Sequence, residues 1–473
     1  MRKNRKQQKN RHQIELFPKG QVNNLMYKPE ESKTGGTGKE IGSGSELLSV
    51  LERERALTEN IMERIVDYVN LNRACQKVIQ NGGQSGVDGM EVKQLHQCYN
   101  KTHNGLRLAL LTEKYEVSPV LKVEIPKATG GTRMLGIPTV KDRLVQQSIH
   151  QELSKHYEPY FSESSYGFRP GQSAHQAIKQ SARYIKEGKE WVVDIDLEKF
   201  FDKINHDRLM QRLSKRIADK RLLRLIRAFL KAGMMEDGLE EQRISGTPQG
   251  GPLSPLLSNI VLDELDRELE RRGHSFCRYA DDCNIYVKSK KAGERVMDSV
   301  VEFIETKLKL KVNRAKSGVR HCSDVKFLGY TIISGGGIRV ADKTVERFKD
   351  KVRTITQRNR GVKFEQVIKE LNNIIVGWRN YFRLSNTWKN NIRDMDGWIR
   401  RKLRCYRLKQ CGRKYSIVKF LRGLGCEESK SWNVVKYSQG WWNMSKKVAV
   451  EHAMNIKWFA QIGLESLAGR VNV

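Results

Sequence analysis

Three aspartates stand out because each interrupts or ends an apolar stretch. Asp281 and Asp282 are adjacent within RYADDCNIYV at residues 278–287, and Asp196 ends WVVDID at residues 191–196. Clustered carboxylates repel one another unless a cation joins them, and oxygen ligands suit Mg²⁺ or Mn²⁺. Two such ions about 4 Å apart can activate an attacking hydroxyl and neutralise leaving phosphate oxygens. The three aspartates therefore predict a two-metal site for phosphoryl transfer, provided that the fold brings them together.

Short strands must position these aspartates. Neighbouring side chains of a strand point to opposite faces, so an adjacent pair such as Asp281 and Asp282 suits a tight turn between two strands. The pattern therefore predicts a hairpin with the pair at its tip. Asp196 is expected at the end of another strand, where a helical pattern begins. Taken singly, the adjacent pair is better explained by a plain turn, and Asp196 by a helix N-cap.

A glycine loop is predicted by TPQGGPLSP at residues 247–255. Glycines let a backbone come close to a substrate, and Gln249 offers both a donor and an acceptor. Ser254 and Pro255 are suited to begin a helix. A turn without a ligand is the alternative for this segment.

A pair of cations flanks a second predicted turn. In IPKATGGTRMLG, at residues 125–136, Lys127 and Arg133 lie on either side of ATGGT. A hairpin there would place the two cations side by side over a triphosphate. Ordinary surface charge is the alternative, and the pair alone does not exclude it.

The strongest global feature is charge. The 473 residues carry 87 Lys and Arg against 54 Asp and Glu, a formal net charge of +33. Residues 341–473 contribute 29 Lys and Arg against 11 Asp and Glu, a net of +18. Cationic side chains gain affinity for polyanions by releasing counterions condensed on phosphates, so nucleic acid is the favoured partner.

Other classes of protein fit the sequence poorly. The eight cysteines show no C-x-x-C spacing, which argues against structural zinc and a disulfide framework. No run of 18 apolar residues occurs, so a membrane span is not expected. Strand and helix patterns mix between about 120 and 335, including a strand-like alternation in LKLKVN, whereas helical patterns dominate beyond 341.

Several segments resemble, in order, the sequence blocks of group II intron-encoded reverse transcriptases. RYADDCNIYV is similar to the catalytic motif, whose YADD form is typical of these enzymes. Other blocks follow the same order along the chain: NGGQSGVDGM, SYGFRPGQSAHQAI, VVDIDLEKFFDKINHDRL, TPQGGPLSPLLSN, LKLKVNRAKS and VKFLGY. IIVGWRNYF and DMDGWIRRKLR resemble the maturase, or thumb, domain. The resemblance covers roughly residues 55–470.

The resemblance implies roles for individual residues. The expected catalytic residues are Asp196 and Asp281, which would bind both metal ions, and Asp282 as the third carboxylate. The expected substrate-binding residues are Lys127 and Arg133 on the triphosphate, Phe201 as a steric gate against a ribose 2′-hydroxyl, Gln249 in the nucleotide pocket, and Lys316 near the carboxylates or the triphosphate. The expected primer grip is Phe327, Leu328, Gly329 and Tyr330.

The implied fold class is α/β (α+β): a right-hand polymerase with fingers, an antiparallel-sheet palm and an α-helical thumb or maturase domain. The expected domains are a basic flexible extension and linker at 1–45, fingers and palm at 46–340, the thumb or maturase domain at 341–425, and a short basic DNA-binding-like segment at 426–473. Many members of the family add an endonuclease with paired cysteines. Cys405, Cys411 and Cys426 lack that pairing, and we expect no endonuclease.

The resemblance implies an RNA-directed DNA polymerase that uses two Mg²⁺ ions, with Mn²⁺ as a substitute, and that assists intron splicing and mobility. The expected partners are group II intron RNA, an RNA template with a DNA primer, target DNA and dNTPs, in a cytoplasmic, nucleoid-associated bacterial ribonucleoprotein. The alternatives are a maturase-only RNA-binding splicing factor, a domesticated reverse transcriptase with a host role, and an RNA-dependent RNA polymerase. The complete aspartate set and the bulky Phe201 favour the first interpretation.

Overall fold

The computed structural model describes residues 58–126, 132–236, 239–241, 246, 250–386 and 389–469. Two compact units are present. One comprises the described parts of Met1–Tyr160 and Phe201–Val261, and the other comprises those of Phe161–Phe200 and Leu262–Val473. The predicted N-terminal extension at 1–45 lies outside the described residues.

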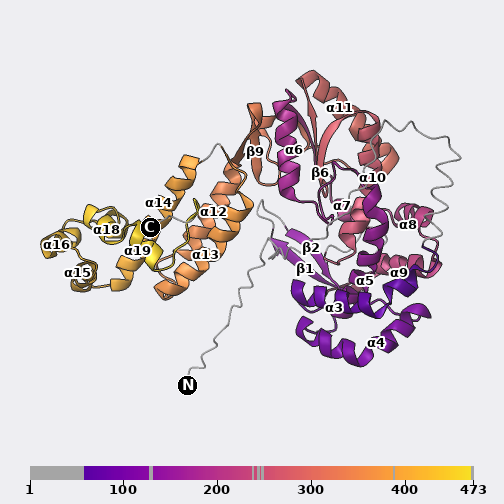
Figure 1. The fold of residues 1–473 in the computed structure, drawn as a ribbon, viewed down its shortest axis with the longest axis horizontal. Helices are drawn as coiled ribbons and strands as arrows, with labels where there is room; N and C mark the ends of the chain where they lie inside the picture. The colour runs from indigo at the N-terminus through magenta and orange to yellow at the C-terminus, as the bar shows by residue number, and fades with distance from the viewer. Residues whose placement is uncertain are drawn as a thin grey trace, which may run out of the picture. The chain divides into compact units, whose positions relative to one another are not determined.

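The first unit combines helices with a small mixed sheet (Figure 1). Its helices are α2 (Ile61–Ile65), α3 (Tyr68–Asn81), α4 (Leu95–Leu111), α5 (Val140–Tyr157), α8 (His206–Arg216) and α9 (Lys220–Lys231). Its strands are β1 (Val120–Pro126), β2 (Thr132–Ile137), β4 (Met234–Glu236) and β5 (Leu239–Glu241), in the order β2-β1-β4-β5. Strands β1 and β2 are antiparallel, with Pro126 paired to Thr132, so the predicted hairpin around ATGGT is confirmed by its strands.

Local sequence explains where several of these helices begin. The side chain at the N-cap accepts a hydrogen bond from a backbone N–H of the first turn, which satisfies a donor that has no partner within the helix. This applies to α3, α5, α8 and α9, whose capping residues are Asp67, Thr139, Asn205 and Asp219. Two further helices, α7 (Phe200–Lys203) and α10 (Ser254–Arg271), cross from one unit to the other along the chain. Helix α10 begins at Ser254, as predicted.

The second unit contains the antiparallel sheet that carries the aspartates. Its strands are β3 (Trp191–Ile195), β6 (Ser275–Tyr279), β7 (Asp282–Val287) and β8 (Gly318–His321), in the order β6-β7-β3-β8. Every pairing in this sheet is antiparallel, which agrees with the predicted palm sheet. Helices α6 (Ala174–Lys186) and α11 (Lys290–Phe303) pack against it (Figure 1).

Helices make up the rest of the second unit after a small two-stranded sheet of β9 (Tyr330–Ile333) and β10 (Gly337–Val340). They are α12 (Asp342–Ile355), α13 (Phe364–Tyr381), α14 (Lys389–Cys411), α15 (Lys414–Gly423), α16 (Glu428–Lys436), α17 (Gly440–Met444), α18 (Val448–Ala453) and α19 (Ile456–Gln461). This run confirms the predicted change to helical structure near residue 341. Among the described helices, none combines the length and apolar character needed to cross a bilayer.

One predicted strand is wrong. The alternating LKLKVN segment begins at the end of a π-helical turn, Ile304–Leu308, and Lys309 takes a left-handed conformation with φ +55°. The segment pairs with the residues after β3 through one antiparallel bridge, between Leu197 and Val312, and not through a continuous ladder. The alternation still buries Leu310 and Val312, but tertiary contacts rather than a strand ladder hold them.

Candidate active site

The adjacent aspartates lie at a hairpin tip, as predicted. Tyr279 of β6 pairs with Asp282, the first residue of β7, so Ala280 and Asp281 form a two-residue turn. Ala280 has φ +58°, a left-handed conformation that costs a residue with a Cβ about 1–2 kcal/mol. The turn is therefore strained and must be held by its surroundings.

The register of the sheet brings the third aspartate to the same place. Asp194 of β3 pairs with Asn284 of β7, and Ile195 pairs with Cys283. One step further along this register puts Asp196 opposite Asp282. Because side chains alternate along a strand, Asp194, Asp196 and Asp282 belong to one face of the sheet. The register thus brings Asp196 and Asp282 to the same end of the sheet, and Asp281 lies in the turn next to Asp282.

The neighbouring carboxylates influence the pKa of Asp282. The pKa of Asp282 is raised to about 7 by desolvation and by repulsion from Asp281, Asp196 and Asp194. The positive charge of Lys316 acts in the opposite direction. Desolvation is the largest cause of this shift, and the negative charges of the three neighbouring carboxylates add to it. Burial also raises the pKa of Asp194, opposed by Arg320.

Two cations lie beside this cluster. Lys316 Nζ is 3.4 Å from Asp196 Oδ2, close to the carboxylates as predicted. Arg320 Nη1 is 2.8 Å from Asp194 Oδ2 and was not predicted from the sequence. The backbone of Asp196 is held by neighbouring residues, since its N–H donates to Ser317 Oγ at 2.9 Å and its carbonyl accepts from the Asn313 N–H at 2.8 Å.

The donor set fits a divalent cation. Carboxylate oxygens are the ligands that Mg²⁺ and Mn²⁺ prefer, and a cation would relieve the repulsion that raises the pKa of Asp282. Among the described residues, however, no three His, Cys, Asp or Glu side chains are already gathered as a metal site. Asp196, Asp281 and Asp282 therefore lie near one another without converging on one point.

Gly167 allows a loop to pack directly against the hairpin turn. A Cβ built at position 167 would lie 2.4 Å from the backbone N of Ala280 and 3.0 Å from the carbonyl carbon of Tyr279. Such distances are far shorter than ordinary contacts, so only glycine fits without a backbone shift. The sequence indicated a family block here but not this contact, because the two segments are more than 100 residues apart.

The FLGY segment forms a tight turn tied to the helices that follow. Phe327 and Tyr330 exchange two backbone hydrogen bonds of 2.9 Å around Leu328 and Gly329, which both have positive φ. The Tyr381 hydroxyl, at the end of α13, donates to the Leu328 carbonyl at 3.0 Å. The segment predicted to grip the primer is therefore a hydrogen-bonded turn, and its contact with a primer stays a prediction.

The structure says less about the remaining predicted residues. Lys127 and Gln249 lie outside the described residues. Arg133 lies in β2, paired with Ile125, and its side chain is not described. Phe201 is half-buried in α7. Their roles in nucleotide binding stay predictions.

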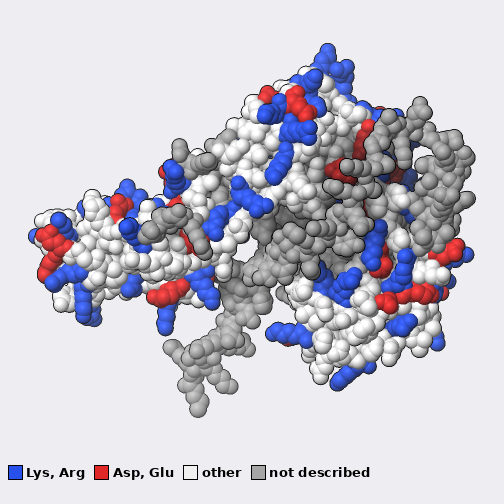
Figure 2. All heavy atoms as spheres, in the orientation of Figure 1, with Lys and Arg blue, Asp and Glu red and all other residues white. Residues whose placement is uncertain are grey.

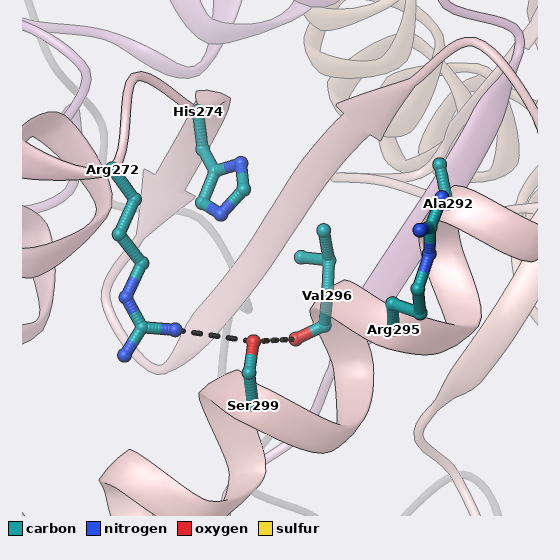
Figure 3. Close-up of a pocket in the computed structure, with 6 residues that line it drawn as sticks. All are labelled: Arg272, His274, Ala292, Arg295, Val296 and Ser299. Carbon is teal, nitrogen blue, oxygen red and sulfur yellow. Dashed lines mark hydrogen bonds between the residues drawn. The ribbon is translucent and has the colours of Figure 1, made fainter.

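A shallow pocket of about 330 Å³ lies elsewhere in the second unit (Figure 3). Arg272, His274 and Arg295 contribute to its lining, and Arg272 Nη1 donates to Ser299 Oγ at 3.1 Å. His274 precedes β6, whereas the turn of Ala280 and Asp281 follows that strand, so the pocket is at the opposite end of β6. None of the predicted site residues lines it.

Comparison with known proteins identifies the family. Residues 125–332 match the model described as "Reverse transcriptase (RNA-dependent DNA polymerase)", and residues 345–422 match "Group II intron, maturase-specific domain". Protein YkfC of Escherichia coli (strain K12) is 34% identical over 287 residues, which cover 52% of this chain and 75% of YkfC. The chain belongs to the group II intron reverse transcriptase and maturase family.

Other relatives of this reverse transcriptase are longer. The group II intron-encoded protein LtrA of Lactococcus lactis subsp. cremoris is 32% identical over 284 residues, covering 46% of this chain and 47% of LtrA. The putative COX1/OXI3 intron 2 protein of Saccharomyces cerevisiae (strain ATCC 204508 / S288c) is 28% identical, covering 67% of this chain and 45% of that protein. The chain thus spans less than half the length of both relatives.

These matches confirm the predicted family and α/β polymerase fold class. The predicted function, RNA-directed DNA polymerase combined with an intron maturase, is confirmed at the level of the two domains. Reverse transcriptases use divalent metal ions, and the maturase-specific domain implies that the chain binds intron RNA.

Proposed function

We propose that this reverse transcriptase copies an RNA template into DNA at the cluster of Asp196, Asp281 and Asp282. A primer 3′-hydroxyl attacks the α-phosphate of a dNTP, the new phosphodiester bond forms, and pyrophosphate leaves. The observation that carries this proposal is the strand register, which supports a shared site for the three carboxylates within a matched reverse transcriptase domain.

The aspartates would hold two Mg²⁺ ions, with Mn²⁺ as a substitute, and such ions lower the pKa of an attacking hydroxyl and neutralise charge on the leaving phosphate. The role of the chain is to hold these oxygens in place. Lys316, 3.4 Å from Asp196, would limit the excess negative charge while it orients that carboxylate or the triphosphate. Arg320 would neutralise the negative charge of Asp194, the fourth carboxylate near the cluster.

The other roles follow from the family resemblance. Lys127 and Arg133 would hold the triphosphate, Gln249 would line the nucleotide pocket, and Phe201 would exclude a ribose 2′-hydroxyl. The turn of Phe327, Leu328, Gly329 and Tyr330 would grip the primer. The division into 1–45, 46–340, 341–425 and 426–473 remains our proposal for the domains.

We further propose that the chain binds template, primer, target DNA and its own intron RNA as a cytoplasmic, nucleoid-associated ribonucleoprotein. The net charge of +18 over residues 341–473 supports this proposal because phosphates are neutralised by Lys and Arg. On the face drawn in Figure 2, Lys and Arg are spread widely over the surface of α12–α19. The maturase-specific match over 345–422 favours intron RNA among these partners.

Primer extension tests the polymerase against the maturase-only alternative. The assay uses an RNA template, a DNA primer, dNTPs and Mg²⁺, with Asp281→Asn as the matched variant. We expect long cDNA from the wild-type chain and none from the variant, while both bind RNA with similar affinity. A folded wild-type chain that binds RNA without extending a primer would support the splicing factor, and a variant that still extends would remove Asp281 from the mechanism.

A further inference from the structure

A buried ion pair lies next to the catalytic turn. Arg278 of β6 and Asp266 of α10 are both fully buried. Arg278 Nε donates to Asp266 Oδ1 at 2.7 Å, and Nη2 donates to Oδ2 at 2.5 Å, which is a two-point fork. Burying two charges costs desolvation free energy, and such a pair often adds no net stability. The free energy of folding therefore does not explain this ion pair, which leaves the geometry of the adjacent turn as its role.

The rest of the guanidinium points to that role. Arg278 Nη1 donates to the carbonyl oxygen of Ala280 at 2.9 Å, and Nη2 also donates to Ser165 Oγ at 2.7 Å. Ala280 is the left-handed residue of the turn, immediately before Asp281. The side chain thus connects a helix, a loop and the turn that carries the aspartates.

Backbone hydrogen bonds also join β6 to the loop that contains Ser165. The Arg278 N–H donates to the Ser164 carbonyl and the Tyr166 N–H donates to the Arg278 carbonyl, both at 2.8 Å. Gly167 then packs against the backbone of Ala280. The loop at 164–167 and the guanidinium therefore fix the turn together.

We propose that Arg278, oriented by Asp266 and Ser165, is the positioning residue that fixes the Ala280–Asp281 turn and thereby the metal-binding geometry of Asp281 and Asp282. This inference rests on the proposed function, because it assumes that these carboxylates hold divalent cations. Arg278 acts through the Ala280 carbonyl. Its loss should weaken metal binding and turnover without changing the affinity for template and primer.

The test compares Arg278→Lys with a matched control. Lysine keeps the positive charge but has no fork to join Asp266, Ser165 and Ala280. Arg272→Lys is the control, because Arg272 also pairs with a carboxylate of α10, Glu268 at 2.7 Å, but lies at the other end of β6. Each purified variant of the 473-residue chain is measured for thermal unfolding, RNA affinity, Mn²⁺ binding by electron paramagnetic resonance, and kcat and KM for the primer–template.

We expect Arg278→Lys to bind Mn²⁺ at least tenfold more weakly and to lose at least tenfold in kcat, with RNA affinity and KM within twofold of wild type. Arg272→Lys should match wild type in all four measurements. Equal Mn²⁺ binding and kcat in the two variants would overturn the inference, as would a change confined to KM.

A milder variant covers the case in which Arg278→Lys does not fold. Ser165→Ala removes one hydrogen bond at Nη2 and leaves the ion pair in place. A several-fold loss in both Mn²⁺ affinity and kcat supports the inference, and no change in either overturns it. If wild-type protein neither binds Mn²⁺ nor extends a primer, the proposed function itself has failed, which is distinct from failure of the positioning role.

Discussion

Replacing Gly167 by alanine should displace the Ala280–Asp281 turn, which carries two of the proposed catalytic aspartates. The new Cβ would lie 2.4 Å from the Ala280 N and 3.0 Å from the Tyr279 carbonyl carbon, whereas ordinary contacts begin at 3.4 Å. Both neighbours are backbone atoms, so no side-chain rotation relieves the overlap. The turn or the loop must therefore retreat by about 1 Å, the shortfall in the closest contact.

A displacement of about 1 Å at reacting groups costs about 100-fold in rate, or about 2.7 kcal/mol of activation free energy. Overpacking lowers the free energy of unfolding by about 1–3 kcal/mol. Single-nucleotide extension at saturating primer–template and dNTP measures the first quantity, and chemical denaturation measures the second.

Gly105→Ala is the matched control, because Gly105 lies within α4 and a methyl group added there would meet no heavy atom within 4 Å outside the neighbouring helix backbone. The control should extend at the wild-type rate and gain up to about 1 kcal/mol in stability, since alanine favours a helix over glycine. Gly167→Ala with wild-type extension and stability would refute the packing argument.

Three further predictions concern the metal, the gate and the grip. Mn²⁺ at 100 times its Kd should stabilise the wild-type chain by about 2.7 kcal/mol in thermal unfolding, and Asp282→Asn should reduce this gain; an equal gain would mean that the ions bind elsewhere. Phe201→Val should raise the kcat/KM for rNTPs relative to dNTPs in primer extension, and an unchanged ratio would argue against a steric gate. Tyr381→Phe removes the 3.0 Å hydrogen bond to Leu328 and should cost about 0.5–1.5 kcal/mol of stability while raising the KM for primer–template; a loss of kcat alone would contradict this.

Patterns between nearby residues were sufficient to predict much of the site. The alternation in WVVDID and RYADDCNIYV predicted β3 and the β6–β7 hairpin, because strand faces and turns are set by neighbours in sequence. Ser254 at the start of α10 followed from the preference of its side chain and of Pro255 for helix starts. The aspartates could be brought together only by assuming that their strands were neighbours, and the resemblance supplied that assumption.

Contacts between distant segments could not be predicted. The Arg278–Asp266 pair and the contact of Gly167 with Ala280 depend on how a helix and a loop pack on the sheet. The sequence signal was an arginine, Arg278, within an apolar strand pattern, but the sequence does not indicate which carboxylate pairs with it. LKLKVN shows the converse error, since its alternation buries Leu310 and Val312 without forming a strand.

The Ala280–Asp281 turn and the adjoining Asp282 combine two unfavourable features with two stabilising contacts. Ala280 adopts a left-handed conformation, and Asp282 experiences the repulsion of three other carboxylates. Arg278 donates a hydrogen bond to the Ala280 carbonyl, and Gly167 packs against the backbone N of Ala280. Relaxation of the turn would relieve both the backbone strain and the charge repulsion. The stabilising free energy of the contacts made by Arg278 and Gly167 must therefore exceed the free energy that this relaxation would release. Variants that weaken the contact of Arg278 or Gly167 with the turn should therefore lose metal affinity before they lose the fold. If bound metal alone assembled the site, such variants would keep their metal affinity for as long as they stayed folded.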